Sequence, residues 1–519
     1  MWNADYIAYK GNTNFIRAYQ GEELVWERKL HWTSEEFWVE NINDYPVVFY
    51  ANEGTILWDK HGKSISEGTP NSGGGVMYSF NGGTWTNIYN ADVKGQVTIP
   101  PHTKMWLYNV TDIDFVSNNN NSRNPLYNIT AEGDNNTYEK YNIGGNLHSL
   151  VYNWDEKVIN VKTPYTFYRL FYNNKIVDAS ELILPSTQLT SNCYDSMFYV
   201  CRELLYPPVL PATKMVKGCY SNMFYMCDNL IETPELPATE LAEYCYRYMF
   251  RGCESLTTTP ELPATTLKRN CYEDMFNGCI SLTETPELPA TELAEYCYCG
   301  MFLRCVNITV APELPVTELA NYCYSNMFYM SGLIKPPVLP ATKMKKGCYH
   351  GMFLQCENLI EAPELPSMIL EDECYDSMFR NCYKLIQPPV LPATTLADCC
   401  YDGMFMGCKS LLTAPELPAT TLKFACYRRM FQWCFALEKS PVLPARELVD
   451  NCYYCMFYES NNIKEITCLA TTNMSVNLGI VGWVYDVSPT GKFIKHPDAV
   501  WEGGHSGIPY GWTIENYTE

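Results

Sequence analysis

One ten-residue motif, GCYSNMFYMC at residues 218–227, recurs down most of the chain and constrains the fold more than any other feature. The period is 26 residues, with one step of 25 where Ser331 replaces the second cysteine of the motif. A unit this small cannot bury its own apolar face, so the copies must stack and share one core, which predicts a solenoid. The eleven copies begin at Cys193, Cys219, Cys245, Cys271, Cys297, Cys323, Cys348, Cys374, Cys400, Cys426 and Cys452.

Each copy, called a rung below, changes its periodicity partway, which predicts two elements per rung. Apolar residues within 219–227 fall on one side at helical spacing, so we expect a short amphipathic helix with its cysteines inward. The next stretch, NLIETPELPAT at 229–239, predicts a short extended segment. Its recurring prolines remove ladder donors, so parallel strand pairing should stop at or before them. The predicted fold class is therefore mixed α+β, a solenoid with a short helix and a short strand per rung.

The composition outside the repeats divides the chain into four domains. Residues 1–30 contain two AYxG units, which predict a small β-meander and a candidate anchor. Residues 31–160 are rich in Trp, Tyr, Val and Thr between glycine turns, which predicts a β-rich, sandwich-like domain. Residues 161–468 form the solenoid, opened by a degenerate copy at 167–189 that we expect to act as a cap. Residues 469–519 predict a small β cap that protects the edge of the last rung.

The 24 cysteines are best explained by packing. The C-x7-C spacing does not match zinc sites, whose cysteines lie two to four residues apart, and nucleophilic catalysis needs a base, yet the repeats hold a single histidine, His350. Carboxylates recur with the period, and the other histidines show no ligand spacing. We therefore expect no catalytic residue, no metal and no cofactor. The predicted core ladder includes Cys219, Met223, Phe224, Cys227, Cys245, Cys253, Cys271 and Cys279.

The charge balance argues against two classes of binding partner. With 37 basic and 58 acidic residues, a net charge of -21 would repel nucleic acid and anionic lipid surfaces. No apolar run is long enough to span a bilayer, so we expect no membrane insertion. The N-terminus lacks the basic start and apolar core of a secretory signal, so we expect folding where thiols stay reduced.

The rung that begins at Cys426 departs from the others. Lys423, Arg428, Arg429 and Trp433 would form a basic, aromatic patch on an acidic rod, and exposed Arg and Trp are typical binding anchors. The alternative is ordinary drift of surface positions. A weaker candidate is the tyrosine set Tyr244, Tyr296 and Tyr322, which would otherwise cover apolar edges between rungs.

The pattern CYxxMFxxCxxLxxxPxLPATxL resembles the leucine-rich repeats of the BspA-like group, found in Bacteroidetes surface proteins and in phages of those bacteria. The resemblance covers roughly residues 164–470, and both flanks resemble the domains that adjoin such repeats. It implies a leucine-rich-repeat solenoid used for binding or adhesion, without catalytic residues. Residues 6–26 resemble the opening of structural proteins of Bacteroidetes phages.

Two function hypotheses follow. In the first, the chain is a virion component, a fibre or decoration protein without a signal peptide, which presents the solenoid to a host cell-surface protein or glycan. Its N-terminal module would contact other virion proteins, and a homo-oligomer is compatible with this role. In the second, it is a bacterial cell-surface adhesin.

Overall fold

The structure is a computed structural model that describes residues 160–472 and 478–518 and several shorter segments before them. The chain forms two compact units. The first comprises Met1–Asp114, Ile129–Ile159 and Ile176–Pro185, and the second comprises Phe115–Asn128, Asn160–Lys175 and Ser186–Glu519. The shorter described segments are 6–7, 15–20, 23–29, 37–41, 43, 47–50, 76–80, 86–87, 96–109, 130–132 and 140–150.

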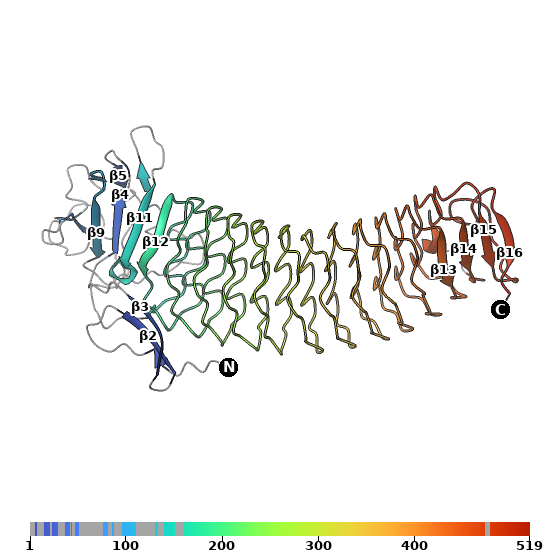
Figure 1. The fold of residues 1–519 in the computed structure, drawn as a ribbon, viewed down its shortest axis with the longest axis horizontal. Coiled ribbons are helices and arrows are strands. Elements are labelled where there is room, and N and C mark those ends of the chain that lie inside the picture. The colour runs from blue at the N-terminus through green and yellow to red at the C-terminus, as the bar shows by residue number, and fades with distance from the viewer. Residues whose placement is uncertain are drawn as a thin grey trace. The chain divides into compact units, whose positions relative to one another are not determined.

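The first unit is built from three β-sheets (Figure 1). One joins β1 (Tyr6–Ile7), β2 (Phe15–Gln20) and β3 (Glu23–Lys29) as antiparallel neighbours in chain order, which is a β-meander within residues 1–30. A second has the order β10-β5-β8, and its strands are also antiparallel. Their bounds are Thr130–Glu132 for β10, Val47–Tyr50 for β5 and Gln96–Ile99 for β8.

The third sheet has the order β12-β11-β4-β9-β6-β7, in which only the β11–β12 pair is parallel. Met105, Leu107 and Ile143 are buried on its strands. A sandwich packing of the second and third sheets stays a prediction. The bounds are Ile176–Ile183 (β12), Tyr141–Asn146 (β11), Phe37–Asn41 (β4), Lys104–Asn109 (β9), Val76–Ser79 (β6) and Thr86–Asn87 (β7), with a 3-10 helix η2 at Leu147–Leu150.

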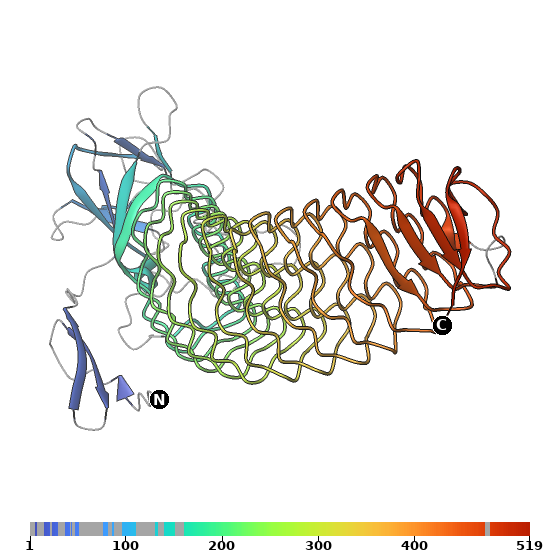
Figure 2. The ribbon, with the colours of Figure 1, turned by 45° about the vertical axis from the view of Figure 1, so that its right-hand side comes forward.

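The second unit is a stack of coils with a period of 26 residues, drawn as successive turns of ribbon in Figures 1 and 2. Across residues 160–472 there is no α-helix, so the short helix predicted for each rung is not formed. In its place is a run of turns, here called the coil segment, that reaches from the residue before the first cysteine to the second cysteine. In the rung of Cys219, Gly218, Asn222 and Met226 all have φ values between 54° and 60°. Every fourth residue is therefore left-handed, which ends any helix before it can form.

The coil segment satisfies its backbone in a two-residue alternation. Cys219, Ser221 and Met223 donate their N–H groups to carbonyls three residues back, at 3.2–3.3 Å. Tyr220 and Asn222 donate to the carbonyls of Cys245 and Arg247 in the following rung, at 3.1 and 2.8 Å. Half of the amide groups thus close turns, and the other half bind the rungs to one another as strands do in a parallel sheet.

The extended segment behaves as its prolines predict. Burial alternates along it, with Leu236 and Ala238 inside and Glu235 outside. Between residues 186 and 438 the described pairing is reduced to isolated parallel bridges such as Lys214 to Glu240. Without a proline N–H, these segments cannot form continuous ladders.

Full strands form at the C-terminal end, where three of the four strands contain no proline. β13 (Lys439–Leu443), β14 (Glu465–Cys468), β15 (Lys492–Lys495) and β16 (Thr513–Asn516) make a parallel sheet. β13 still holds Pro441, and there the register shifts and the Ser440 hydroxyl accepts a bond from Thr467 N at 3.1 Å. A 3-10 helix, η3 (Leu478–Ile480), opens a further coil turn in the region predicted as a cap. The stack therefore continues through that region, and β16 is exposed along its length.

The core consists of columns that run through the stack. Tyrosine and phenylalanine rings of successive rungs stack, as in Tyr246–Tyr272 at 5.9 Å and Phe250–Phe276 at 5.6 Å. The eight residues predicted for the core ladder are fully buried. The second cysteines of the rungs form a column of their own, and we call their side chains the second-column thiols. Most of them donate a hydrogen bond to a phenylalanine carbonyl of the preceding rung, as Cys253 Sγ does to Phe224 O at 3.1 Å.

Candidate functional site: the coil face

The coil segments point two residues inward and the next two outward, so their outward residues form a continuous surface that we call the coil face. It consists of the residues one before, and two, three, six and seven after, the first cysteine of each rung. From Asn192 to Glu459 these positions include many tyrosines and arginines, with Gly, Asn and Ser between them, and no lysine. Tyr and Arg are enriched in protein interfaces and Lys is depleted, so this face has an interface composition.

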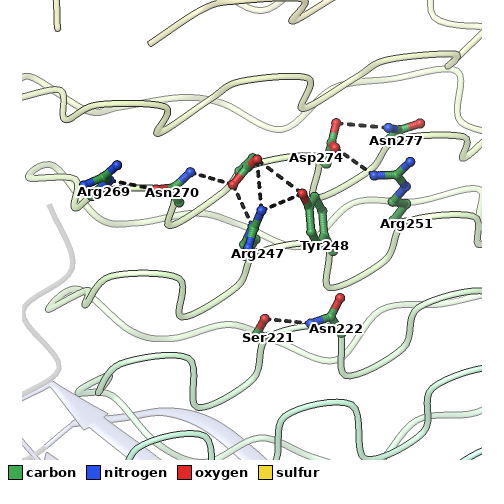
Figure 3. A network of polar contacts seen from close by, with 10 residues as sticks. Ser221, Asn222, Arg247, Tyr248, Arg251, Arg269, Asn270, Asp274 and Asn277 are labelled. Atoms are coloured by element: carbon green, nitrogen blue, oxygen red, sulfur yellow. Dashed lines mark hydrogen bonds and ion pairs between the residues drawn. The ribbon is translucent and has the colours of Figure 1, made fainter. Parts of the chain in front are cut away.

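Figure 3 shows a network that binds the rungs together on the N-terminal half of this face. The Arg247 Nε atom lies 2.7 Å from Glu273 Oε2 in the next rung, and Arg247 Nη2 donates to the Tyr248 hydroxyl at 2.7 Å. Asn270 Nδ2 donates to the same Glu273 carboxylate at 2.6 Å. Arg247 therefore joins two neighbouring rungs through the Glu273 carboxylate, which Asn270 also binds.

A second ion pair in Figure 3 has the same role. Arg251 Nη1 lies 2.9 Å from Asp274 Oδ2, and Asn277 Nδ2 donates to Asp274 Oδ1 at 3.0 Å. Burial raises the pKa of Asp274 to about 6, while Arg251 and Asn277 oppose that shift. The charges of Arg251 and Asp274 therefore compensate each other within the protein.

Tyrosines continue the network toward the start of the stack. Tyr172 and Tyr199 stack at 5.3 Å, Tyr199 and Tyr225 stack at 4.5 Å, and the Arg251 guanidinium lies 5.9 Å from the Tyr225 ring. Stacked rings cover one another's faces, so this column presents ring edges to solvent.

An acidic column occupies the C-terminal half of the coil face. His350 Nδ1 lies 3.6 Å from Asp376 Oδ2, and Asp402 is bound by Arg428, whose Nε lies at 2.8 Å. Burial, with the neighbouring Asp402 charge, raises the pKa of Asp376, against the opposing effect of His350. One histidine and one arginine thus bracket two adjacent aspartates.

The structure places three of the four predicted patch residues on one coil segment. Arg428 is held by Asp402 of the preceding rung, so it is not available as a free cation. Trp433 Nε1 donates to Glu459 Oε2 at 3.1 Å, and Arg429 lies over the Tyr454 ring at 5.7 Å. Lys423 is exposed three residues before Cys426, and within the described residues no hydrogen bond or ion pair joins its side chain to the other three.

The predicted tyrosine set also lies on the coil face, at left-handed positions. Tyr296 and Tyr322 stack at 4.9 Å, and Tyr322 donates its hydroxyl to Glu373 Oε2 at 2.8 Å. Tyr244 lies between two cations, Lys217 and Arg247, each 5.5 Å from its ring. These rings therefore bridge rungs, in addition to covering their edges.

The burial of the thiols determines their chemistry. The pKa of Cys271 is raised to about 12 by burial, and partly exposed Cys399 has a pKa raised to about 11 by burial and by Asp402. Thiols with such pKa values are weak nucleophiles at neutral pH. Among the residues that the structure describes, no group of three or more His, Cys, Asp or Glu is placed to hold a metal ion. The same residues include no helix with the length and hydrophobicity to cross a membrane.

Comparisons with protein families, with curated proteins and with solved structures gave no match.

Proposed function

We propose that this chain is a non-catalytic binding protein with a BspA-like leucine-rich-repeat solenoid, which serves as a fibre or decoration component of a phage virion. In this proposal the coil face attaches the particle to a protein or glycan of the host surface, and the N-terminal module contacts other virion proteins. The observation that supports it best is the composition of the coil face, where eight of the eleven rungs carry tyrosine or arginine and none carries lysine.

The stack also suits this role because its rungs hold a large set of side chains at regular spacing on a rigid frame. Rungs of a parallel stack are about 4.8 Å apart, so a ligand laid along the coil face would meet a new set of side chains at that interval. Repeat proteins commonly bind through such an extended surface.

Fractionation of a producing culture on a density gradient tests the location. We expect peptide mass spectrometry to find the chain with intact phage particles at a fixed copy ratio. Recovery only with bacterial membranes would contradict the virion role and favour a cell-surface adhesin. The purified chain should also bind whole host cells, and failure to bind any candidate host would count against adhesion itself.

A further inference from the structure

Arg429 and Trp433 hold matching positions on the coil segment of the Cys426 rung. They are four residues apart, with φ values of 54° and 63°, so both side chains leave the backbone from left-handed residues on the coil face. The same two positions of the preceding rung are Gly403 and Gly407. Arg429 and Trp433 therefore stand beside two positions that carry no side chain.

Arg429 differs from neighbouring arginines in its electrostatic partners. Arg428 is paired with Asp402, and Arg251 with Asp274. Arg429 contacts the Tyr454 ring, and no carboxylate of the described residues forms an ion pair with it. A guanidinium that lies against an aromatic ring is held in place while its N–H donors remain available to a ligand.

Trp433 is held on the same side as Arg429, by the following rung. Its indole N–H is bound to Glu459, in the following rung, which orients the ring and occupies that carboxylate. Gly407 holds the same position in the preceding rung, and the Asn381 side chain of the rung before that covers this glycine, since a Cβ on Gly407 would lie 2.1 Å from Asn381 Oδ1. Asn381 therefore extends over Gly407, which lies between it and Trp433 in the stack.

The backbone N–H groups of this surface already have hydrogen-bond partners within the protein. Each N–H from Cys426 to Cys434 donates either within the rung or to the next rung. An extended peptide that binds by strand pairing needs free main-chain groups, so this surface does not suit it. A sugar needs only side chains, because its apolar C–H face packs on an aromatic ring and its hydroxyls bond to amides.

We propose that Arg429 and Trp433, with Asn381, bind a carbohydrate that carries a carboxylate group. The sugar ring packs on the Trp433 indole, Asn381 bonds to its hydroxyls from its place over Gly407, and its carboxylate forms a bidentate pair with Arg429. This inference rests on the proposed attachment function and adds to it a ligand class and the residues that select it.

The test uses the full chain and a panel of oligosaccharides that end in uronic or sialic acids, each with its carboxyl-reduced neutral counterpart. We expect calorimetric binding to at least one acidic oligosaccharide, and at least tenfold weaker binding to its neutral form. Arg429→Met and Trp433→Leu should each weaken binding at least tenfold. Arg429→Lys should weaken it less, because lysine keeps the charge but lacks the paired N–H donors of a guanidinium. Lys409→Met is the control, because Lys409 is an exposed cation 4.3 Å from the Tyr383 ring that lies outside the coil face.

Three results would overturn the inference: no binding to any acidic oligosaccharide, equal binding of the neutral forms, or full displacement by poly-glutamate, which would indicate an acidic peptide. Thermal melting of each variant shows whether lost binding reflects lost folding. Adhesion to host cells is measured in parallel. Wild-type adhesion that Arg429→Met leaves unchanged would reject this site but keep the proposed function, whereas acidic-sugar binding without adhesion would reject the function but keep the site.

Discussion

The Tyr322 hydroxyl donates a hydrogen bond to Glu373 Oε2 at 2.8 Å, although the two residues lie two rungs apart. The equivalent position of the rung between them is Gly347, which has a φ of 55°. A Cβ there would lie 2.1 Å from Tyr322 Cε1, so the ring can cross the rung only because residue 347 has no side chain. The same arrangement occurs twice more: the Asn192 side chain lies over Gly218 of the next rung, and the Asp274 side chain lies over Gly300.

Gly347→Ala should therefore destabilise the protein through two causes, the left-handed backbone and the clash with Tyr322. Gly403→Ala provides the matched control, because Gly403 has a φ of 56° but its Cβ would make only ordinary contacts, with Ser377 Oγ at 3.5 Å and Met406 Cβ at 3.8 Å. We expect about 1 kcal/mol from backbone strain in both variants and a further 1–3 kcal/mol from the clash at 347 alone. Urea unfolding measures the difference, and equal losses in both variants would show that the ring moves away freely.

The second-column thiols should tolerate serine better than alanine. Cys253 Sγ donates to Phe224 O, and Ser460, which replaces a cysteine in its rung, makes the same bond to Phe431 O at 2.7 Å. Cys253→Ala should cost about 1–3 kcal/mol, because it leaves a small cavity and removes a buried hydrogen bond. Cys253→Ser should cost less in urea unfolding. A larger loss for serine would mean that sulfur packing outweighs the hydrogen bond.

The native protein should react slowly with thiol reagents. Burial raises the pKa of Cys193, Cys271 and Cys408 to about 12, so their thiolate fraction at pH 8 is very small. Of the three partly exposed thiols, Cys299 also has its pKa raised to about 12, so only Cys399 and Cys455 should label in a stopped assay at pH 8, and all 24 cysteines should label in denaturant. Rapid labelling of many thiols without denaturant would indicate that the stack opens readily.

Stability should fall as the pH rises from about 4 to about 6.5. Burial raises the pKa of both Asp195 and Asp274 to about 6, from an ordinary value of 3.8. The folded state therefore binds more protons than the unfolded state between these values, and the free energy of unfolding decreases with pH in that window. Asp195→Asn should flatten the slope in urea unfolding at several pH values, since its amide can still accept the bond from Ser196. An unchanged slope would contradict the raised pKa of Asp195.

Much of the solenoid could be predicted from the spacing of a few residue types. A 26-residue period with apolar cysteine, tyrosine, methionine and phenylalanine requires stacking, because one rung cannot bury those side chains alone. The prolines of the LPAT segment predicted interrupted pairing, and the structure shows isolated bridges there. The sequence also showed that Arg429 and Trp433 differ from the residues at the same positions of the other rungs.

The coil segment could not be assigned correctly in this way. Over nine residues, a repeat of four residues and a helical repeat of 3.6 place Cys219, Met223 and Cys227 on the same side, so periodicity alone does not separate them. The recurrence of Gly and Asn at a spacing of four residues, as at Gly218 and Asn222 or Gly347 and Gly351, was the available signal of a left-handed backbone.

The sequence by itself determined that identical rungs must stack, which residues lie inside, and where proline limits strand pairing, because these depend on local chemistry repeated at a fixed interval. Only the tertiary structure decided which polar side chains have a charged partner within the protein. Arg428 and Arg429 are adjacent and chemically identical, yet one is neutralised by Asp402 and the other lies over the Tyr454 ring. That difference depends on which residue of a rung some 26 positions away stands beside each guanidinium, and this register exists only in the folded stack.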